Sequence, residues 1–330
     1  MTPKETVTFW DIKNIKSITP ANGGLINKTY FVKTAEDLLV LQKIHPIIAG
    51  SNATLNYSAV TEFLRENGFP AQILLKTKAG LLTTDDGKET WRLLRAIQGK
   101  VFEVVESAWH TYEAGKALLA FHAIMGKFKK PLERVIPAFQ YAEVFKKLHA
   151  YQNKFSNKSH ANSAAKFLLA AFPQCILPSN LPRRIIHADP KISNFIFDSQ
   201  NHAIAMIDLD GVQKLTPLYD IGDAVRSLCG GEEDDPQNCF SQDKFRAFQR
   251  GYFKSAKNYL SKEERELIPR AAKLVMLGLA ARFLNDYIDD NYFGWNKKKY
   301  NSRRAHNLAR ALGQIALYKS FIKTTKQEPG

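Results

Sequence analysis

Cysteine is scarce in this chain of 330 residues, and its three cysteines are not clustered. Cys175, Cys229 and Cys239 form no Cys-x-x-Cys pair and no set of cysteine and histidine ligands. A disulfide framework or a structural zinc site requires such groupings, so the sequence excludes both as organising features. We expect reduced thiols, as in a cytoplasmic protein.

Long apolar runs are absent as well. No segment approaches the roughly 18 apolar residues that a membrane span needs. The first residues, MTPKETVTFW, lack the apolar stretch of a secretory signal. The sequence also contains no internal repeat and no low-complexity segment. We therefore expect no membrane association and a cytoplasmic location.

The composition is that of a folded protein with an excess of positive charge. Hydrophobic residues make up 45% and charged residues 24%, and the length suits a large core in two lobes. The net charge of +15 favours a basic surface, a nucleotide-binding cleft or nucleic-acid binding. Nucleic acid is the weakest interpretation, because the lysines are scattered and no recognised binding module accompanies them. The oligomeric state stays open.

The first 97 residues have the pattern of a small sheet with one helix. Apolar residues at three-to-four spacing predict a helix over residues 53–67, which Gly68 ends. A turn over residues 34–37 would join the first two strands in a hairpin. Segments rich in β-branched, aromatic and aliphatic residues predict four strands: 29–33, 38–44, 73–76 and 91–97.

The rest of the chain, residues 98–330, has mainly helical periodicity. Residues 185–208 are the exception, with a tight loop and two short strands, 195–197 and 203–207. The fold class is therefore α+β, with an N-terminal antiparallel sheet lobe of residues 1–97 and a larger, mainly helical lobe. Five segments carry the helical spacing: 105–125, 142–154, 243–259, 270–287 and 302–322.

The loop and hairpin carry a spaced set of polar residues. Asp189 lies two residues after His187, Asn194 five after Asp189, and Asp208 fourteen after Asn194. Phosphoryl transfer needs a carboxylate for the acceptor hydroxyl and hard oxygen ligands for Mg²⁺. Asp189 suits the first role, as catalytic base, while Asn194 and Asp208 suit the second. His187 is better interpreted as an organiser of the loop. Each residue alone could merely shape a loop, and the joint spacing favours catalysis.

This pattern, HxDxxxxN followed by an apolar hairpin ending in IDxD, resembles the catalytic and metal loops of aminoglycoside phosphotransferases and choline kinases. The resemblance implies a protein-kinase-like bilobal fold and an ATP- and Mg²⁺-dependent kinase with a small-molecule hydroxyl acceptor. Asp210 would be a second metal ligand or would hydrogen-bond within the loop. Asp220, in YDIGDAVR, is expected to accept backbone hydrogen bonds and brace the catalytic loop.

The sheet lobe should then bind the nucleotide. Gly23 and Gly24 precede a strand, where a glycine turn lets the backbone approach phosphates, although an ordinary hairpin turn fits equally well. The Walker motif GxxxxGK[ST] is absent. The next strand offers Gln42 and Lys43, whose side chains alternate in facing. We favour Lys43 as the phosphate partner because of its charge.

Two further features complete the expected nucleotide site. Ala96 and Ile97 end the last predicted strand, where the chain would pass between the lobes. Their backbone groups could therefore meet adenine. Glu62, on the predicted helix, is a candidate ion-pair partner for the strand lysine, with a solvated surface role as the alternative.

A narrower resemblance extends over most of the chain. Seven segments look like the N-acetylhexosamine 1-kinase group, which phosphorylates the anomeric hydroxyl of N-acetylglucosamine or N-acetylgalactosamine. Ala188 and Gln140 depart from it, since they stand where a cysteine and a histidine are expected. The matching segments are GGLINKTYFV, LVLQKIH, ERVIPAFQ, HADPK, IDLDGV, DIGDAVR and RFLNDYIDDNYF.

Acceptor-site candidates follow the metal loop. Asp223 and Arg226 are three residues apart on a predicted helix, as a structural ion pair or as groups facing the acceptor. Arg282 and Asp286 have a similar spacing. Tyr292 could belong to an aromatic wall for a sugar, with core packing as the alternative. Residues 232–235, an acidic run, should form a solvated loop.

Two alternatives to a sugar kinase stay open. One is a kinase of another acceptor: an aminoglycoside, choline or another amino alcohol. The other is a kinase-fold binding protein without catalysis, against which the retention of Asp189, Asn194 and Asp208 argues.

Overall fold

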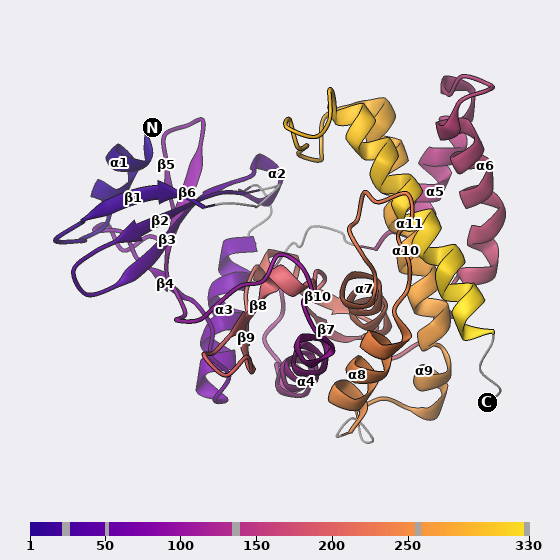
Figure 1. The fold of residues 1–330 in the computed structure, drawn as a ribbon. Helices are drawn as coiled ribbons and strands as arrows, with labels where there is room; N and C mark the ends of the chain where they lie inside the picture. The colour runs from indigo at the N-terminus through magenta and orange to yellow at the C-terminus, as the bar shows by residue number, and fades with distance from the viewer. Residues whose placement is uncertain (22–26, 50–52, 134–138, 255–258, 327–330) are drawn as a thin grey trace.

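The structure, a computed structural model, describes residues 1–21, 27–49, 53–133, 139–254 and 259–326. It has two lobes (Figure 1). The sheet lobe consists of strands β1–β6 with helices α1–α3, and the helical lobe consists of α4–α11 with strands β7–β10. The N-terminus lies in the sheet lobe, and the described chain ends at the far side of the helical lobe.

The sheet lobe contains one six-stranded antiparallel sheet in the order β1-β2-β3-β6-β4, with β5 paired to β6. The predicted turn between β2 and β3 is present, because Thr34 N–H donates to Asp37 O at 2.9 Å. The strands are β1 Ser17–Pro20, β2 Lys28–Lys33, β3 Leu38–Ile44, β4 Ile73–Leu75, β5 Thr84–Asp85 and β6 Thr90–Arg95.

The two faces of this sheet are buried against different partners. Leu41 and Trp91 pack on one face with Trp10, from the segment that follows α1 (Pro3–Thr6). Val40 and Leu94, on the other face, belong to the same core as α3 (Ala53–Glu66) and the helical lobe. The hydrophobic core is therefore continuous from one lobe to the other. The short helix α2 spans Pro46–Ala49 after β3.

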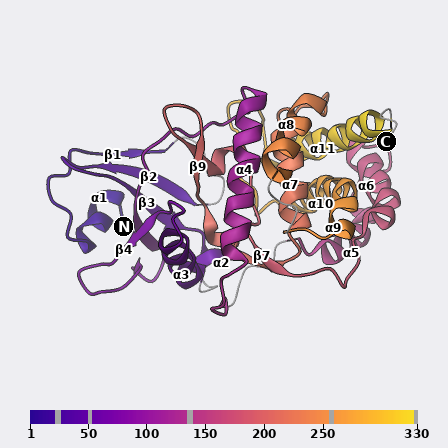
Figure 2. The ribbon, with the colours of Figure 1, turned by 90° about the horizontal axis from the view of Figure 1, so that it is seen from below.

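The helical lobe is built around α10, a 22-residue helix that packs on α5, α6, α7 and α11. α4 lies between the sheet lobe and the other helices (Figure 2). Among the described helices, none combines the length and apolar character that crossing a bilayer requires. The helices are α4 Ala108–Met125, α5 Tyr141–Ala150, α6 His160–Ala171, α7 Leu218–Cys229, α8 Gln242–Phe253, α9 Lys262–Glu266, α10 Ile268–Asp289 and α11 Arg303–Thr325.

Two small strand pairs interrupt these helices. β8 (Phe195–Phe197) and β9 (Ala203–Met206) form the predicted hairpin. β7 (Arg184–Ile186) pairs with β10 (Gln213–Leu215), so the loop that begins at His187 and the segment after Asp208 are tied together at their outer ends. The two pairs form a frame around the candidate catalytic loop.

The predicted fold class, with an antiparallel sheet lobe before a larger helical lobe, is confirmed. The helix predicted over residues 243–259 ends at Phe253, and β1, β5, β7 and β10 were not predicted. The predicted lobe boundary at residue 97 falls in the connection between β6 and α4. It stays a prediction, because the core is shared by both lobes.

Candidate active site

The candidate catalytic loop is held by a buried carboxylate at the start of α7. Asp220 accepts hydrogen bonds from His187 N–H at 2.6 Å and Ala188 N–H at 2.7 Å. The Nε2 of His122 lies 2.9 Å from the same carboxylate, and its Nδ1 lies 2.7 Å from the hydroxyl of Tyr252. The predicted brace by Asp220 is confirmed, and it is anchored through α4 to α8. Ala188 has a φ of 73°, a conformation that non-glycine residues rarely adopt.

His187 is fully buried and acts on the backbone around it. Its Nε2 lies 3.0 Å from Ile207 O, and its Nδ1 lies 3.3 Å from the N–H of Asp189. These partners require Nε2 to donate and Nδ1 to accept. Burial lowers the pKa of His187, which keeps the ring neutral. Its geometry is that of a loop organiser, as expected from the sequence.

Asp189 lies beside a lysine and an asparagine that both donate hydrogen bonds to its carboxylate. Its Oδ2 accepts from Lys191 Nζ at 2.7 Å and from Asn194 Nδ2 at 3.0 Å. Asn194 Nδ2 also donates to the backbone oxygen of Asp189 at 2.8 Å. Burial raises the pKa of Asp189, but the charge and hydrogen bond of Lys191, with the charges of His187 and Arg226, together outweigh burial, and the net shift is downward. The carboxylate is therefore ionised at neutral pH.

Asp208 is brought back beside this loop by the β8–β9 hairpin, as predicted. Ile207 N–H donates to Asn194 O at 2.9 Å, so Asp208 follows directly after a backbone contact with Asn194. Asp208 adopts the left-handed conformation, with a φ of 64°. Burial raises its pKa to about 6, with the charges of Asp210 and Asp189 acting in the same direction against Lys191. The site thus holds a carboxylate whose ionised form a nearby cation would stabilise, as the charge of Lys191 already does.

The residues expected at the phosphates lie in different places. Gly23 and Gly24 lie outside the described residues. Lys43 contacts the carboxylate of Glu89, whereas Gln42 shares the opposite face of the sheet with Arg92 and accepts from its Nε at 2.8 Å. It is Gln42 that belongs to the face of Val40, toward the helical lobe. The structure therefore does not support the preference for Lys43. Glu62, on α3, is exposed.

The connection between the lobes is pinned at both ends. Ala96 N–H donates to Leu38 O at 3.0 Å, which leaves the backbone carbonyl of Ala96 available to a ligand. The next residue, Ile97, is half-buried. Lys100 then exchanges two backbone hydrogen bonds with Phe197 of β8, at 2.7 and 2.8 Å. Gly99 lies so close to Phe197 O that a Cβ would stand 2.6 Å from it, which only glycine permits.

Asp223 and Arg226 form the predicted intrahelical pair, with Nε to Oδ1 at 2.7 Å. Both are buried, and the charge of Arg226 helps to lower the pKa of Asp189. Glu233 lies 3.5 Å from Arg226 and 3.3 Å from Arg310. The acidic run 232–235 forms a loop, as predicted, with Glu232 exposed, but Glu233 and Asp234 are engaged in ion pairs and only partly solvated.

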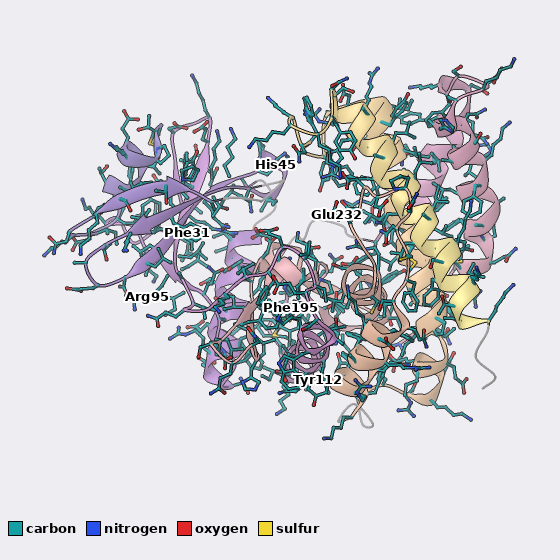
Figure 3. The ribbon with its side chains drawn as sticks, viewed as in Figure 1. Phe31, His45, Arg95, Tyr112, Phe195 and Glu232 are labelled. Atoms are coloured by element: carbon teal, nitrogen blue, oxygen red, sulfur yellow. The ribbon has the colours of Figure 1, made fainter. Side chains whose placement is uncertain are left out.

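Tyr292 lies at the inter-lobe side of the helical lobe. Its ring centroid is 6.4 Å from that of His45, the residue directly after β3, which Figure 3 labels at the edge of the sheet lobe. The guanidinium of Arg282 lies 5.9 Å from the centre of the Tyr292 ring. Asp286 instead accepts the backbone N–H groups of residues 291–293, so the pair expected between Arg282 and Asp286 was wrong.

Comparison with known proteins identifies the family. The family model described as phosphotransferase enzyme family (APH) matches residues 17–253. The chain belongs to this family. It is a small-molecule phosphotransferase that acts on a hydroxyl acceptor.

Solved structures of kinases share the fold of this phosphotransferase. A microcompartment-associated aminopropanol kinase matches with a TM-score of 0.66 and 16% identity, over 98% of both chains. An amicoumacin kinase matches with 0.67 and 15%, over 95% of this chain and 91% of that one. An aminoglycoside phosphotransferase from Alicyclobacillus acidocaldarius matches with 0.62 and 14%, over 99% and 97%. At these identities the likeness is one of fold, which does not by itself establish the acceptor.

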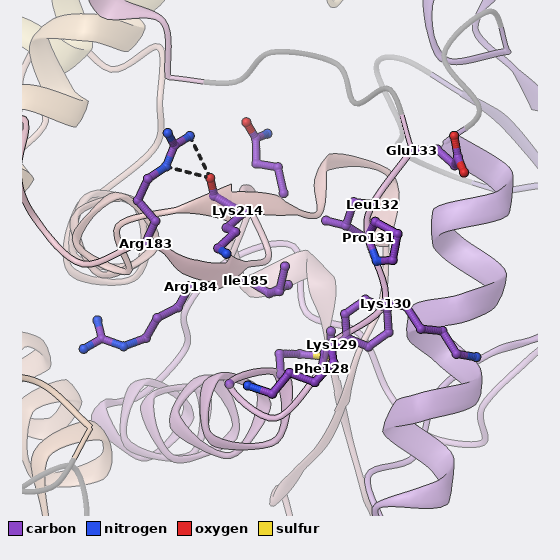
Figure 4. A pocket seen from close by; sticks show the side chains of 13 residues that line it. Phe128, Lys129, Lys130, Pro131, Leu132, Glu133, Arg183, Arg184, Ile185 and Lys214 are labelled. Carbon is purple, nitrogen blue, oxygen red and sulfur yellow. Dashed lines mark hydrogen bonds between the residues drawn. The ribbon is translucent and has the colours of Figure 1, made fainter.

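A cavity of about 550 Å³ lies between the end of α4 with the segment after it and the strands β7 and β10 (Figure 4). It is lined by basic side chains, but Arg183 donates to Lys214 O and Arg184 pairs with Glu264. None of the predicted site residues lines it. The cavity is therefore separate from the candidate catalytic groups.

Sequence analysis missed two charged residues at the site. Lys191 stands two residues after Asp189, and this spacing was available as a signal. Arg92 pairs with Asp210 across 118 residues of sequence, at 2.6 and 2.7 Å. No local pattern reveals such a pair. The hydrogen bonds of Asp210 go to the sheet lobe and not to its own loop, and its role as a second metal ligand stays a prediction.

Proposed function

We propose that the protein transfers the terminal phosphoryl group of ATP to a hydroxyl of an N-acetylhexosamine, with Asp189 as base. The observation that carries the reaction type is the bonding of Asn194 to both the backbone and the carboxylate of Asp189, with Asp208 folded back beside them. The proposed base and the proposed metal ligands thus share one network, as phosphoryl transfer requires.

The donor atoms suit Mg²⁺. Asn194 donates through Nδ2 to Asp189, so its Oδ1 is left to face away as an oxygen ligand. In the described part of the chain, no cluster of three or more His, Cys, Asp or Glu could hold a metal by itself. Mg²⁺ commonly takes one or two protein oxygens and completes its shell with phosphates and water. When bound, the ion would neutralise phosphate charge during transfer.

Two groups of the chain would act on the reacting atoms. Asp189, ionised at neutral pH, would orient the acceptor hydroxyl and accept its proton as the new O–P bond forms. Lys191, hydrogen-bonded to Asp189, would present its ammonium to the transferring phosphoryl oxygens. Ala96, Ile97 and Gln42 are the described candidates for contacts with the nucleotide.

The charges around Asp189 favour a neutral, hydroxyl-rich acceptor. Asp223 is paired with Arg226, and Glu233 is shared by Arg226 and Arg310. A cationic amine would find these carboxylates already neutralised. A sugar could instead use such fixed polar groups as hydrogen-bond partners, while Tyr292 supplies an aromatic surface.

The alternative is an amino-alcohol acceptor. It is favoured by fold likeness to an aminopropanol kinase and, with a TM-score of 0.55 and 12% identity, to an ethanolamine kinase of Plasmodium vivax. The amicoumacin kinase was solved with AMP-PNP and Ca²⁺, which supports an ATP-type donor and a divalent cation for either acceptor.

The deciding experiment incubates the protein with ATP, Mg²⁺ and N-acetylglucosamine or N-acetylgalactosamine. We expect a sugar 1-phosphate, recognised by phosphorus–proton coupling to the anomeric proton in NMR. The methyl glycoside of each sugar is the control, because its anomeric oxygen is blocked and it should give no product. Turnover on aminopropanol, ethanolamine or an aminoglycoside without turnover on either sugar would overturn the acceptor and leave the kinase intact.

A further inference from the structure

Arg92 of β6 is completely buried, and its guanidinium crosses from the sheet lobe to the metal loop. Nη1 and Nη2 donate to the two carboxylate oxygens of Asp210 at 2.6 and 2.7 Å, a two-pronged geometry that lysine cannot reproduce. The side chain of Asp210 is only 6% exposed. Removing two charges from water is costly, so such a pair is tolerated only with further hydrogen bonds.

Those further bonds all come from the sheet lobe. Gln42 of β3 accepts from Arg92 Nε at 2.8 Å, and Asn27 Nδ2 donates to Asp210 at 3.1 Å. The ring of Tyr57, on α3, lies 4.5 Å from the guanidinium carbon, a favourable cation–π distance. Side chains from the sheet lobe thus surround the pair: Arg92 and Asn27 contact the Asp210 carboxylate, and Gln42 and Tyr57 contact Arg92.

Asp210 lies close to both the proposed metal ligand Asp208 and the candidate catalytic loop. Asp210 lies two residues after Asp208, in the 3-10 turn Leu209–Gly211. A Cβ at Gly211 would lie 3.2 Å from Ala188 Cβ, so this turn packs directly on the catalytic loop. Displacing Asp210 would therefore displace Asp208 and disturb the residue before Asp189.

We propose that the Arg92–Asp210 pair is a positioning device that fixes Asp208 relative to the sheet lobe, so that binding of metal–nucleotide depends on a residue that need not touch either. This inference rests on the proposed function. It assigns to Arg92 the link between the sheet and the candidate metal loop, a role that the sequence analysis gave to no residue. Lys43 lies on the other face of the sheet, at Glu89.

The test compares Arg92→Met, Asp210→Asn and the double variant. Each single change leaves one buried charge unpaired and should lower the melting temperature, whereas the double change removes both charges and should recover much of it. All three should raise the Mg²⁺ concentration that half-saturates ATP binding by about 10–100-fold, the usual effect of losing an outer-shell partner of a metal site. Calorimetric titration measures this without any acceptor.

The partly buried pair Arg184–Glu264 is the matched control, since it has a similar two-pronged geometry but joins β7 to α9. Arg184→Met with Glu264→Gln should lower the melting temperature without moving the Mg²⁺ requirement. Arg92→Lys keeps the positive charge but loses the two-pronged hydrogen bonding to Asp210. This variant should therefore fold but need a higher Mg²⁺ concentration for half-saturation of ATP binding.

The inference is overturned if the folded double variant and Arg92→Lys bind Mg²⁺–ATP like the wild type, or if the control variant shifts the requirement equally. Wild-type protein that binds no Mg²⁺–ATP would overturn the proposed function itself, and this inference with it. If the wild type binds Mg²⁺–ATP and the variants bind it equally well, only this inference is overturned.

Discussion

Asp189 and Lys191 set the chemistry at the scale of single residues. The lysine holds the carboxylate ionised, which suits a base that must accept a proton only as the acceptor oxygen attacks phosphorus. Asn194, a proposed metal ligand, also donates a hydrogen bond to the Asp189 carboxylate. The position of the proposed base is therefore linked to that of a proposed metal ligand.

Asp189→Asn should lower kcat by about 100- to 10,000-fold, the usual contribution of a general base, and leave Mg²⁺–ATP affinity nearly unchanged. Coupled ADP release measures the first quantity and calorimetric titration the second. Asp198→Asn is the control, because Asp198 caps the turn of the same hairpin away from the site and should keep near-normal turnover. Near-normal turnover of Asp189→Asn would contradict the assignment.

His306 offers a pH prediction. Burial lowers its pKa to about 4, with the charge of Arg310 acting in the same direction and Asp234 opposing. A histidine whose folded pKa is depressed stabilises the fold above its unfolded pKa and loses that stability as pH falls toward the folded value. Between pH 7.5 and 5.0 the wild type should therefore lose about 1–2 kcal/mol more unfolding free energy than His306→Gln.

Urea unfolding of both proteins at the two pH values measures this difference. His306→Gln keeps a neutral polar group near Asp234 and Asn296, the present partners of the ring. Parallel losses in wild type and variant would show that the histidine does not contribute.

At the scale of elements, α4 and α8 cross closely at Gly251. A Cβ at this position would lie 2.0 Å from the backbone oxygen of Tyr112, so the helices can meet only because the side chain is a hydrogen. Gly251→Ala should destabilise the fold by about 1–3 kcal/mol, the usual cost of overpacking. Gly126→Ala, at the end of α4 with its nearest atom at 3.3 Å, should be nearly neutral. Equal unfolding free energies for the two variants would contradict this account.

The elements with a clear period were predictable. β3, α3 and the β8–β9 hairpin follow the apolar spacing of their residues, and Asp189, Asn194 and Asp208 were brought together as expected. β7 and β10 were not predictable, because each is three residues long and exists through its partner about 30 residues away. Lys43 was preferred to Gln42 because of its charge. Which of two neighbouring strand residues faces the helical lobe depends on the strand register, and a shift of one residue exchanges the two faces of the sheet.

At the scale of the whole molecule, the lobes share one core. Val40 and Leu94 of the sheet pack in the same cluster as α3, α4 and the helical lobe, and the Arg92–Asp210 pair crosses between them. We expect one calorimetric transition, with equal calorimetric and van't Hoff enthalpies, although proteins of two domains often show two. Two resolved transitions would show that the lobes fold independently.

The bond between Lys100 and Phe197 has a consequence for the order of product release. It joins the segment that connects the lobes to β8, the strand that begins directly after Asn194, while Arg92 joins β6 to the turn after Asp208. Any rotation that opens the sheet lobe would therefore pull on both proposed metal ligands at once. We expect ADP and Mg²⁺ to depart in a single kinetic step, so stopped-flow traces of nucleotide and metal release should share one rate constant.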